Sequence, residues 1–151
     1  MKKKFYKIFI RRNKWDEDKG RWVLCWSGPY CNCPSHWTIR ANSTLTLCDC
    51  EVLDLNCYNE CCPGIHYANN AWIRHQIMSP NMTPLYFISR DKHANLNQCV
   101  VYEVKPTGHH IDPLNNRQNK YKKFRTDKLK LVRRLSRKEV YKVFNLPRRE
   151  K

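Results

Sequence analysis

Cys99-Val100-Val101-Tyr102-Glu103-Val104 is the most strand-like stretch of the chain, because β-branched and aromatic residues fill most of its positions. Pro106-Thr107-Gly108 follows it and predicts the turn that ends the strand. Near the start of the chain, residues 5–11 and 21–26 have a similar composition and flank a turn at 16–20, which predicts a β-hairpin. Further short strands are expected at residues 37–40, 44–48 and 85–89. Connections this short favour antiparallel neighbours over a parallel sheet.

Two helices and a last strand complete the expected fold. Residues 68–78 make the best helical stretch in the body of the chain, and Pro80 ends it because proline cannot continue a helix. Residues 124–134 alternate leucine with lysine in part and predict one strand with a basic face. Ser136, with Glu139 three residues later, makes a capping-box pattern that predicts a final helix. The expected fold class is therefore α+β: a small, mostly antiparallel sheet with one or two helices packed on it.

The chain has 151 residues, the length of one ordinary domain. We expect residues 1–146 to form this single α+β domain and residues 147–151 to be a basic C-terminal tail, because Pro147 stops the last helix. Apolar residues make up 41% of the chain and aromatic residues 12%, which is too much for a wholly disordered protein. The expected core residues come from the predicted strands, helices and turns: Trp22, Trp26, Trp37, Trp72, Leu47, Ile65, Ile73, Ile77, Phe87, Val101, Leu131, Val140 and Phe144.

Positive charge is concentrated at the two ends of the sequence. The formal net charge is +16, of which residues 1–14 contribute +7, residues 15–116 contribute −3 and residues 117–151 contribute +12. Such a skew favours a polyanionic partner such as nucleic acid, although a basic surface can also serve only to keep a protein soluble.

The leading functional hypothesis is a non-enzymatic accessory protein that contacts nucleic acid through these basic segments. The cations expected to meet phosphates lie close together in the sequence: Lys120, Lys122, Lys123, Arg125, Lys128, Lys130, Arg133, Arg134, Arg137 and Lys138. Tyr121 and Phe124 lie among them and are available to stack on bases. The hypothesis requires the two basic ends of the chain to converge on one surface. The same charge pattern leaves open an interaction module that binds an acidic protein partner.

The sequence predicts an intracellular protein without a membrane partner. Lys7 interrupts the apolar run that follows the basic start, and no small-residue cleavage site follows it, so we recognise no secretory signal. No stretch approaches the roughly 20 consecutive apolar residues that a membrane span needs.

Cysteines cluster in the middle of the chain, which contains nine of them in all. The odd number and a reducing compartment argue against a full disulfide framework. Cysteines two apart in a strand share a face, so the C-x-C pairs could present thiolates to one zinc ion. The candidate ligands for this single zinc are Cys31, Cys33, Cys48, Cys50, Cys57, Cys61, Cys62 and His66. The spacing is tighter than in known zinc fingers, and the sequence favours the alternative that several of these cysteines are buried core residues.

A small Cys/His enzyme of unassigned reaction is the third hypothesis. Cys62 lies four residues before His66, and the pair His109 and His110 precedes Asp112, so either group could supply a base and its partner. No glycine-rich phosphate loop or other catalytic motif occurs, and a structural role is the better explanation for each histidine. The sequence therefore favours a protein that is not an enzyme and assigns no catalytic residue.

Several short motifs resemble those of one group of small domains. The stretch Cys62-Pro63-Gly64-Ile65-His66 is similar to the C-x-G-[ILF]-H element of uncharacterised domains in phages and large DNA viruses. Val101 to Pro106 is similar to their V-x-V-x-P strand, and residues 111–132 resemble the loop and basic K-x-R strand that follow. The opening stretch 5–8 also resembles their first strand. The many cysteines and the basic C-terminal helix depart from that pattern. The resemblance implies a viral or phage accessory domain of α+β type, and it transfers no catalytic residue.

Overall fold

The structure is a computed structural model that describes six parts of the chain: residues 3–27, 39–47, 53, 64–78, 99–112 and 120–146. Within strands, the side chains of 10–14, 23–27 and 99 are not described. The predicted strand at 85–89 and the basic tail at 147–151 lie outside the described residues.

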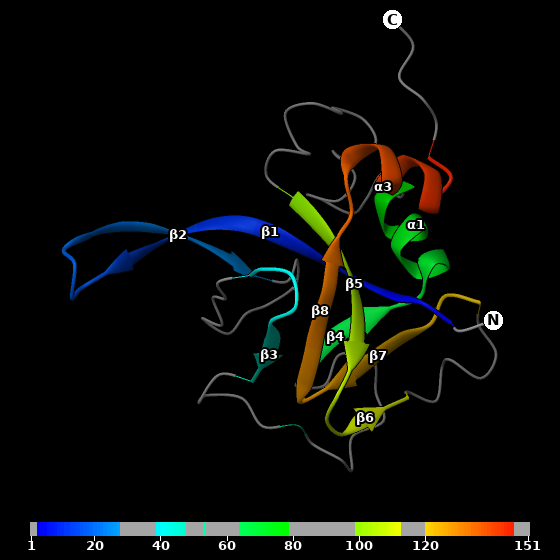
Figure 1. Cartoon of the computed structure of the whole chain (residues 1–151), viewed down its shortest axis with the longest axis horizontal. Helices are drawn as coiled ribbons and strands as arrows, with labels where there is room; N and C mark the ends of the chain where they lie inside the picture. The colour runs from blue at the N-terminus through cyan, green and yellow to red at the C-terminus, as the bar shows by residue number, and fades with distance from the viewer. Residues whose placement is uncertain are drawn as a thin grey trace, which may run out of the picture.

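The described residues form one curved, antiparallel sheet with two helices against it (Figure 1), which confirms the α+β fold class. The strands are β1 Phe5–Asp16, β2 Arg21–Ser27, β3 Thr44–Thr46, β4 Ile65–Ala68, β5 Cys99–Pro106, β6 His110–Ile111, β7 Lys123–Thr126 and β8 Lys128–Arg134. Their order in the sheet is β3-β8-β5-β1-β4-β7-β6, with β2 paired to β1 beside this path. The helices are α1 Asn70–Met78 and α3 Arg137–Val143.

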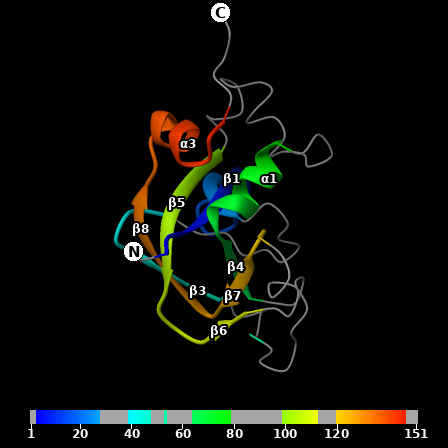
Figure 2. The ribbon, with the colours of Figure 1, turned by 90° about the vertical axis from the view of Figure 1, so that its right-hand side faces the viewer.

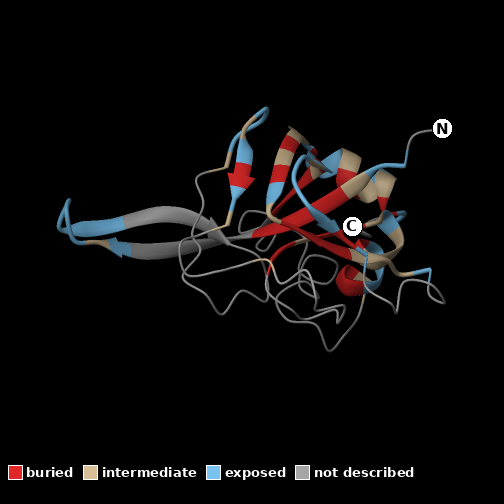
Figure 3. Cartoon of the chain, turned by 90° about the horizontal axis from the view of Figure 1, so that it is seen from below, coloured by how far each residue is buried: buried red, intermediate tan, exposed pale blue. Residues whose placement is uncertain are grey.

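Strand β1 has two halves with different neighbours. Its first half pairs with β5, from Phe5 opposite Val104 to Ile10 opposite Cys99. Its second half pairs with β2, from Ile10 opposite Ser27 to Asp16 opposite Arg21, and residues 11–16 have no other partner among the described strands. This second half and β2 project away from the body as a two-stranded arm (Figures 1 and 3). The predicted hairpin is confirmed, and it is longer than the sequence pattern indicates.

Strands β5–β6 and β7–β8 together form one long hairpin that bends sharply in the middle. The register continues across the bend, with Pro106 opposite Leu129 and His110 opposite Thr126. At the bend, the Asp127 carboxylate accepts a hydrogen bond of 2.7 Å from the His109 amide. A Cβ atom on Gly108 would lie 2.0 Å from Asp127 Oδ1, so any larger residue there would require the Asp127 side chain to move. The prediction of one uninterrupted strand over 124–134 is wrong, because this turn of the backbone divides it.

The bend curls the sheet, and the buried residues form an inner and an outer core. Figure 3 shows buried residues in red along the strands and helices. The inner core gathers residues that face into the curl: Phe9, Leu45, Ile65, Tyr67, Val100, Tyr102, Val104, Phe124, Leu129 and Leu131. The outer core lies between the sheet and the two helices: Tyr6, Ile8, Ala68, Ile73, Ile77, Val101, Leu135, Val140, Phe144 and Leu146. Strand β1 supplies both cores because successive residues of a strand point to opposite faces.

Most of the predicted core is confirmed. The predicted residues that are buried are Ile65, Ile73, Ile77, Val101, Leu131, Val140 and Phe144. Trp72 and Leu47 are partly buried and pack against the two cores. Trp22 is a wrong prediction: its side chain is 66% exposed, because it lies at the end of the arm, beyond the reach of the body. The remaining predicted core residues, Trp26, Trp37 and Phe87, have no described side chains.

The last helix begins where the sequence predicts. The Ser136 side chain accepts a hydrogen bond from the Glu139 amide, and the Glu139 carboxylate accepts one from the Ser136 amide, so the capping box is formed. Val140 and Phe144, both predicted core residues, pack this helix against the sheet. Neither α1 nor α3, the helices of the described segments, is long and apolar enough to cross a membrane.

Candidate nucleic-acid interface

Asn69 joins the start of α1 to a segment 50 residues later in the chain. Its side-chain oxygen accepts hydrogen bonds from the amides of Trp72, at 2.9 Å, and Lys122, at 3.1 Å. Its side-chain nitrogen donates to the Lys120 carbonyl at 2.8 Å, and its own amide donates to the Lys122 carbonyl at 3.0 Å. Asparagine is a preferred helix N-cap because its side chain satisfies an otherwise unpaired amide of the first turn. This residue therefore caps α1 and holds residues 120–122 against it.

The junction brings aromatic rings and lysines together on the surface. The His75 and Tyr121 rings stack, with centroids 4.4 Å apart and an interplanar angle of 25°. Lys120 Nζ lies 5.1 Å from the centre of the Tyr121 ring, and Lys123 Nζ lies 5.6 Å from that of Trp72. Both distances are typical of cation–π contacts. We call this surface the α1 patch and define it by six residues: Trp72, His75, Lys120, Tyr121, Lys122 and Lys123.

The α1 patch combines positive charge with accessible rings. His75 and Lys120 are exposed, and Trp72, Tyr121, Lys122 and Lys123 are partly exposed. Across the parts of the chain that are described, neither Lys120 nor Lys122 forms an ion pair with a carboxylate. Such a surface suits a ligand that carries both negative charge and flat rings.

A second cationic surface lies on the outer face of β5 and β8. Lys105 stands directly opposite Lys130 across the two strands, and Lys128 follows on the same face of β8. Leu129 and Leu131 alternate with these lysines and are fully buried in the inner core, so the predicted basic face of this strand is confirmed. We call Lys105, Lys128 and Lys130 the β8 face. Like charges directly opposite each other destabilise a sheet, so this pairing costs stability unless an anion covers it.

Arg133, farther along β8, forms ion pairs with two carboxylates. Its Nε lies 3.4 Å from Glu103 Oε1, and its Nη1 hydrogen-bonds the Glu139 carboxylate. Lys4 Nζ lies 3.6 Å from the same Glu103 oxygen. The hydrogen bond from Arg133 lowers the pKa of Glu139, which keeps that carboxylate ionised. This network ties the start of β1 and α3 to the sheet, so Arg133 has a structural role.

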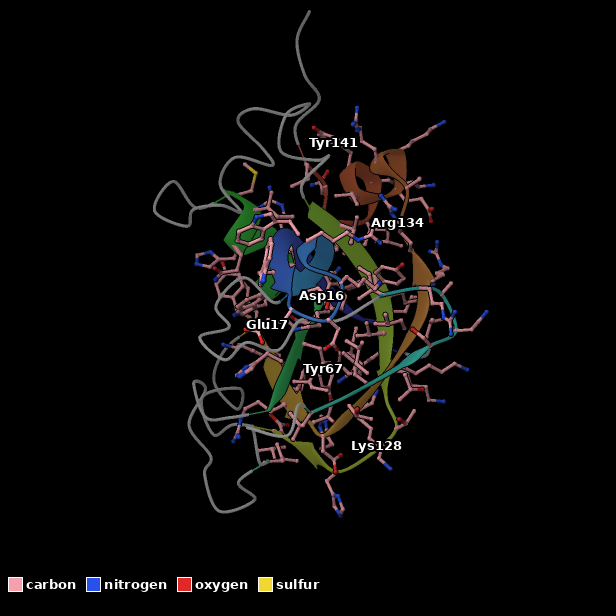
Figure 4. All side chains as sticks on the ribbon, turned by 90° about the vertical axis from the view of Figure 1, so that its left-hand side faces the viewer. Asp16, Glu17, Tyr67, Lys128, Arg134 and Tyr141 are labelled. Carbon is pink, nitrogen blue, oxygen red and sulfur yellow. The ribbon has the colours of Figure 1, made fainter. Side chains whose placement is uncertain are left out.

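The ten predicted phosphate-binding cations do not gather on one surface. Lys120, Lys122 and Lys123 lie in the α1 patch, while Lys128 and Lys130 lie on the β8 face. Arg134, Arg137 and Lys138 are exposed at the end of β8 and on α3. Lys128 and Arg134 mark β8 on one side of the body, and α1 lies on the other (Figure 4), an arrangement that Figure 2 shows from the opposite direction.

Arg125 and Phe124 are the two predicted contact residues that the fold removes from the surface. Arg125 is fully buried and lies opposite His66 in the β4–β7 pair. Its side chain lies close to Gly64: a Cβ atom added to Gly64 would be only 3.2 Å from the Arg125 Cβ. Gly64 has φ of 145°, a conformation that favours glycine and allows this close approach. Phe124 is 6% exposed and belongs to the inner core, next to Tyr67 and Phe5. Neither side chain can reach a nucleic acid bound at the surface.

The two neighbouring histidines of the enzyme hypothesis have separate partners. His109 Nδ1 lies 3.2 Å from Asp127 Oδ2, with the imidazole 72% exposed. His110 Nδ1 hydrogen-bonds the hydroxyl of Tyr67, a buried residue of the inner core. Burial lowers the pKa of His110, against the opposing effect of Asp112, and burial also raises the pKa of Tyr67. The His109 ring therefore contacts Asp127 at the bend, and the His110 ring contacts Tyr67 of the inner core.

The cysteine predictions fall outside what the structure describes. No cysteine side chain is described, and this includes every cysteine of the proposed zinc site and Cys62 of the Cys/His pair. In the described segments, no three His, Cys, Asp or Glu residues are grouped so that they could hold a metal. His66 lies in β4 opposite Arg125, on the outer face of the β4–β7 pair. The zinc site stays a prediction.

Sequence reasoning missed Asn69, Trp72 and His75 as parts of a surface site. The helix predicted over 68–78 begins two residues too early: Ala68 ends β4 and α1 starts at Asn70, so the prediction placed Asn69 inside the helix and missed its role as the cap. Its bonds to Lys120 and Lys122 were not readable, because they span about 50 residues of chain. Comparison of the chain with protein-family models, with curated proteins and with solved structures finds no match.

Proposed function

We propose that this chain is a non-enzymatic accessory protein that binds single-stranded nucleic acid on the α1 patch. The observation that supports the proposal is the stack of Tyr121 on His75, flanked by Lys120 and Lys122. Proteins that bind single strands without sequence preference combine a cationic track with aromatic rings on which bases stack. The α1 patch has both components, and Asn69 holds them in place before a ligand binds.

The arrangement favours single strands over duplexes. In a duplex the faces of the bases are stacked on one another, so Tyr121 and Trp72 would have no base to contact. Phosphates would still meet Lys120, Lys122 and Lys123, which gives a weaker, purely electrostatic interaction. The proposal therefore includes a preference for unpaired nucleotides, with little discrimination between base sequences.

Fluorescence anisotropy with a labelled single-stranded oligonucleotide of mixed sequence tests the proposal. With three lysines on phosphates, log Kd should change with log salt with a slope of about 2 for single strands. Tyr121→Ala should weaken binding by roughly 5- to 150-fold, the range expected for the loss of one base–aromatic stack. Lys120→Gln with Lys122→Gln should weaken binding and reduce the salt slope.

The control is Lys142→Gln, which removes one positive charge from an exposed position on α3, away from the patch, and is matched to the single variant Lys120→Gln. It should leave affinity within about twofold of the original protein. Equal losses in Lys142→Gln and in the patch variants would indicate a general charge effect and reject the α1 patch as the site. Affinity that does not change with salt would reject phosphate binding altogether.

A further inference from the structure

Two tryptophans at the end of the arm are the most exposed large apolar side chains in the described part of the chain. Trp15 is 47% exposed and Trp22 is 66% exposed. They stand opposite each other in the β1–β2 register and contact edge to face, with ring centroids 5.6 Å apart. Tryptophan is strongly enriched among the residues that dominate binding energy at protein interfaces. An adjacent pair of exposed tryptophans at the end of a hairpin is therefore a candidate contact surface.

The arm carries this pair away from the rest of its own molecule. Among the described strands, residues 11–16 of β1 pair with β2 alone, so the arm reaches about 20 Å beyond the strand pairing with β5. The arm projects from one side of the body in two perpendicular views (Figures 1 and 3). Its end cannot fold back on the body without breaking the continuous strand β1. Among the residues that the structure describes, nothing outside the arm covers the two tryptophans.

The turn beside the tryptophans determines the charge of that partner. Asp16, Glu17 and Asp18 follow Trp15 directly, and Asp16 uses one oxygen to accept a hydrogen bond from the Lys19 amide at 3.1 Å. Glu17 and Asp18 are exposed and form no ion pair with the residues that the structure describes. Elsewhere in those residues, Glu103, Glu139 and Asp127 already face Arg133, Lys4 or His109. Lys19 and Arg21 are exposed in the same turn, so residues 16–21 have a net charge of −1 on a chain whose net charge is +16.

The β8 face has the complementary properties. Lys105 and Lys130 stand opposite each other, and Lys128 extends the row, with Thr44 and Thr46 of β3 alongside. None of the three lysines forms an ion pair with the described carboxylates. An acidic turn placed on this row would relieve the repulsion between Lys105 and Lys130. The tryptophan rings beside the turn would gain cation–π contacts with the same lysines.

We propose that the end of the arm docks on the β8 face of a second copy of the chain, so that two molecules exchange arms in a symmetric dimer. The same pair of surfaces is then used twice, as twofold symmetry requires. Nucleic acid is the poorer occupant for the arm, because residues 16–21 have a net negative charge and nucleic acid is a polyanion. The dimer leaves the α1 patch exposed, since α1 lies on the other side of the body from β8 (Figure 4).

Analytical ultracentrifugation without nucleic acid, at about 0.15 M salt where the Debye length is about 8 Å, tests this inference independently of the proposed function. The original protein should form dimers, and Trp15→Ser with Trp22→Ser should raise the dimer dissociation constant at least tenfold. Both tryptophans are exposed, so the variant should keep the circular dichroism spectrum of the fold. A monomer at all concentrations of the original protein would overturn the inference.

A charge exchange distinguishes this dimer from other arrangements. One variant carries Asp16→Lys, Glu17→Lys and Asp18→Lys, and the other carries Lys105→Glu, Lys128→Glu and Lys130→Glu. Each alone should be monomeric, because its turn and its β8 face then have the same sign. A mixture of the two should restore a dimer, since each turn then meets an opposite charge on the other molecule. Dimers formed by either variant alone, or no dimer in the mixture of two folded variants, would overturn the proposed arrangement.

Discussion

Replacement of Asn69 by alanine tests how the candidate interface is held together. The change removes three hydrogen bonds of the side chain: those from the Trp72 and Lys122 amides and the one to the Lys120 carbonyl. The bond from the Asn69 amide to the Lys122 carbonyl remains, because it belongs to the backbone. The variant should therefore keep its fold while the first turn of α1 and residues 120–122 loosen.

The expected cost follows from the three bonds. Loss of an asparagine N-cap costs about 1 kcal/mol, and the two bonds to residues 120–122 contribute about 0.5–1.5 kcal/mol each, with the lower end appropriate for exposed atoms. The free energy of unfolding should therefore fall by about 2–3 kcal/mol, measured by urea denaturation monitored by circular dichroism. Because His75 and Tyr121 come from the two segments that Asn69 joins, affinity for the oligonucleotide should fall as well.

Asn69→Asp is the matched control, because it changes one atom of the side chain. Aspartate still accepts from both amides and suits the positive end of the helix dipole, but it cannot donate to the Lys120 carbonyl. Amide hydrogen exchange should show Lys122 protected in Asn69→Asp and exposed to exchange in Asn69→Ala. The Leu135 amide, bonded to the Val101 carbonyl at 2.9 Å, should be unaffected in both variants. A destabilisation of Asn69→Ala below about 0.5 kcal/mol, with Lys122 still protected, would refute the reasoning.

Three further predictions concern the bend, His110 beside the inner core, and the last helix. Gly108→Ala should destabilise the fold by about 1–3 kcal/mol in urea denaturation, because the new Cβ would overlap the Asp127 carboxylate; a neutral effect would show that the bend adapts. Burial lowers the pKa of His110 below its ordinary value of about 6.5, so the folded state favours the neutral ring. This contribution to the free energy of unfolding is complete above pH of about 6.5 and is lost as the pH falls toward the lower pKa of the folded state. A His110→Gln variant should lack that part of the pH dependence of stability. An unchanged dependence of stability on pH in this variant would contradict the assignment. Ser136→Ala should cost about 1 kcal/mol through loss of the capping box, whereas Ser43→Ala, which removes an exposed hydrogen bond to the Arg40 carbonyl, should cost less; equal costs would argue against the capping role.

The candidate site shows where sequence reasoning reaches its limit. Lys120, Tyr121 and Lys122 were predicted as contact residues from local charge and aromatic content, and the structure places them on one surface. Arg125 and Phe124 have the same local character, yet the fold buries both. The difference is set by which strand pairs with β7, and that pairing joins residues about 60 positions apart. A run of neighbouring basic residues therefore did not predict a continuous basic surface.

The sequence by itself determined the features that depend on near neighbours in the chain. These include the antiparallel hairpin at the start, the alternating face of β8 and the capping box of α3, because a turn, a strand or a cap is decided within a few residues. Only the tertiary structure decided the order of the strands, the bend at Asp127, the exposure of Trp22 and the contact of Tyr121 with His75. The physical reason is that each of these depends on pairing or packing between distant segments, or on its absence, and a local pattern of apolar and charged residues is compatible with several such arrangements.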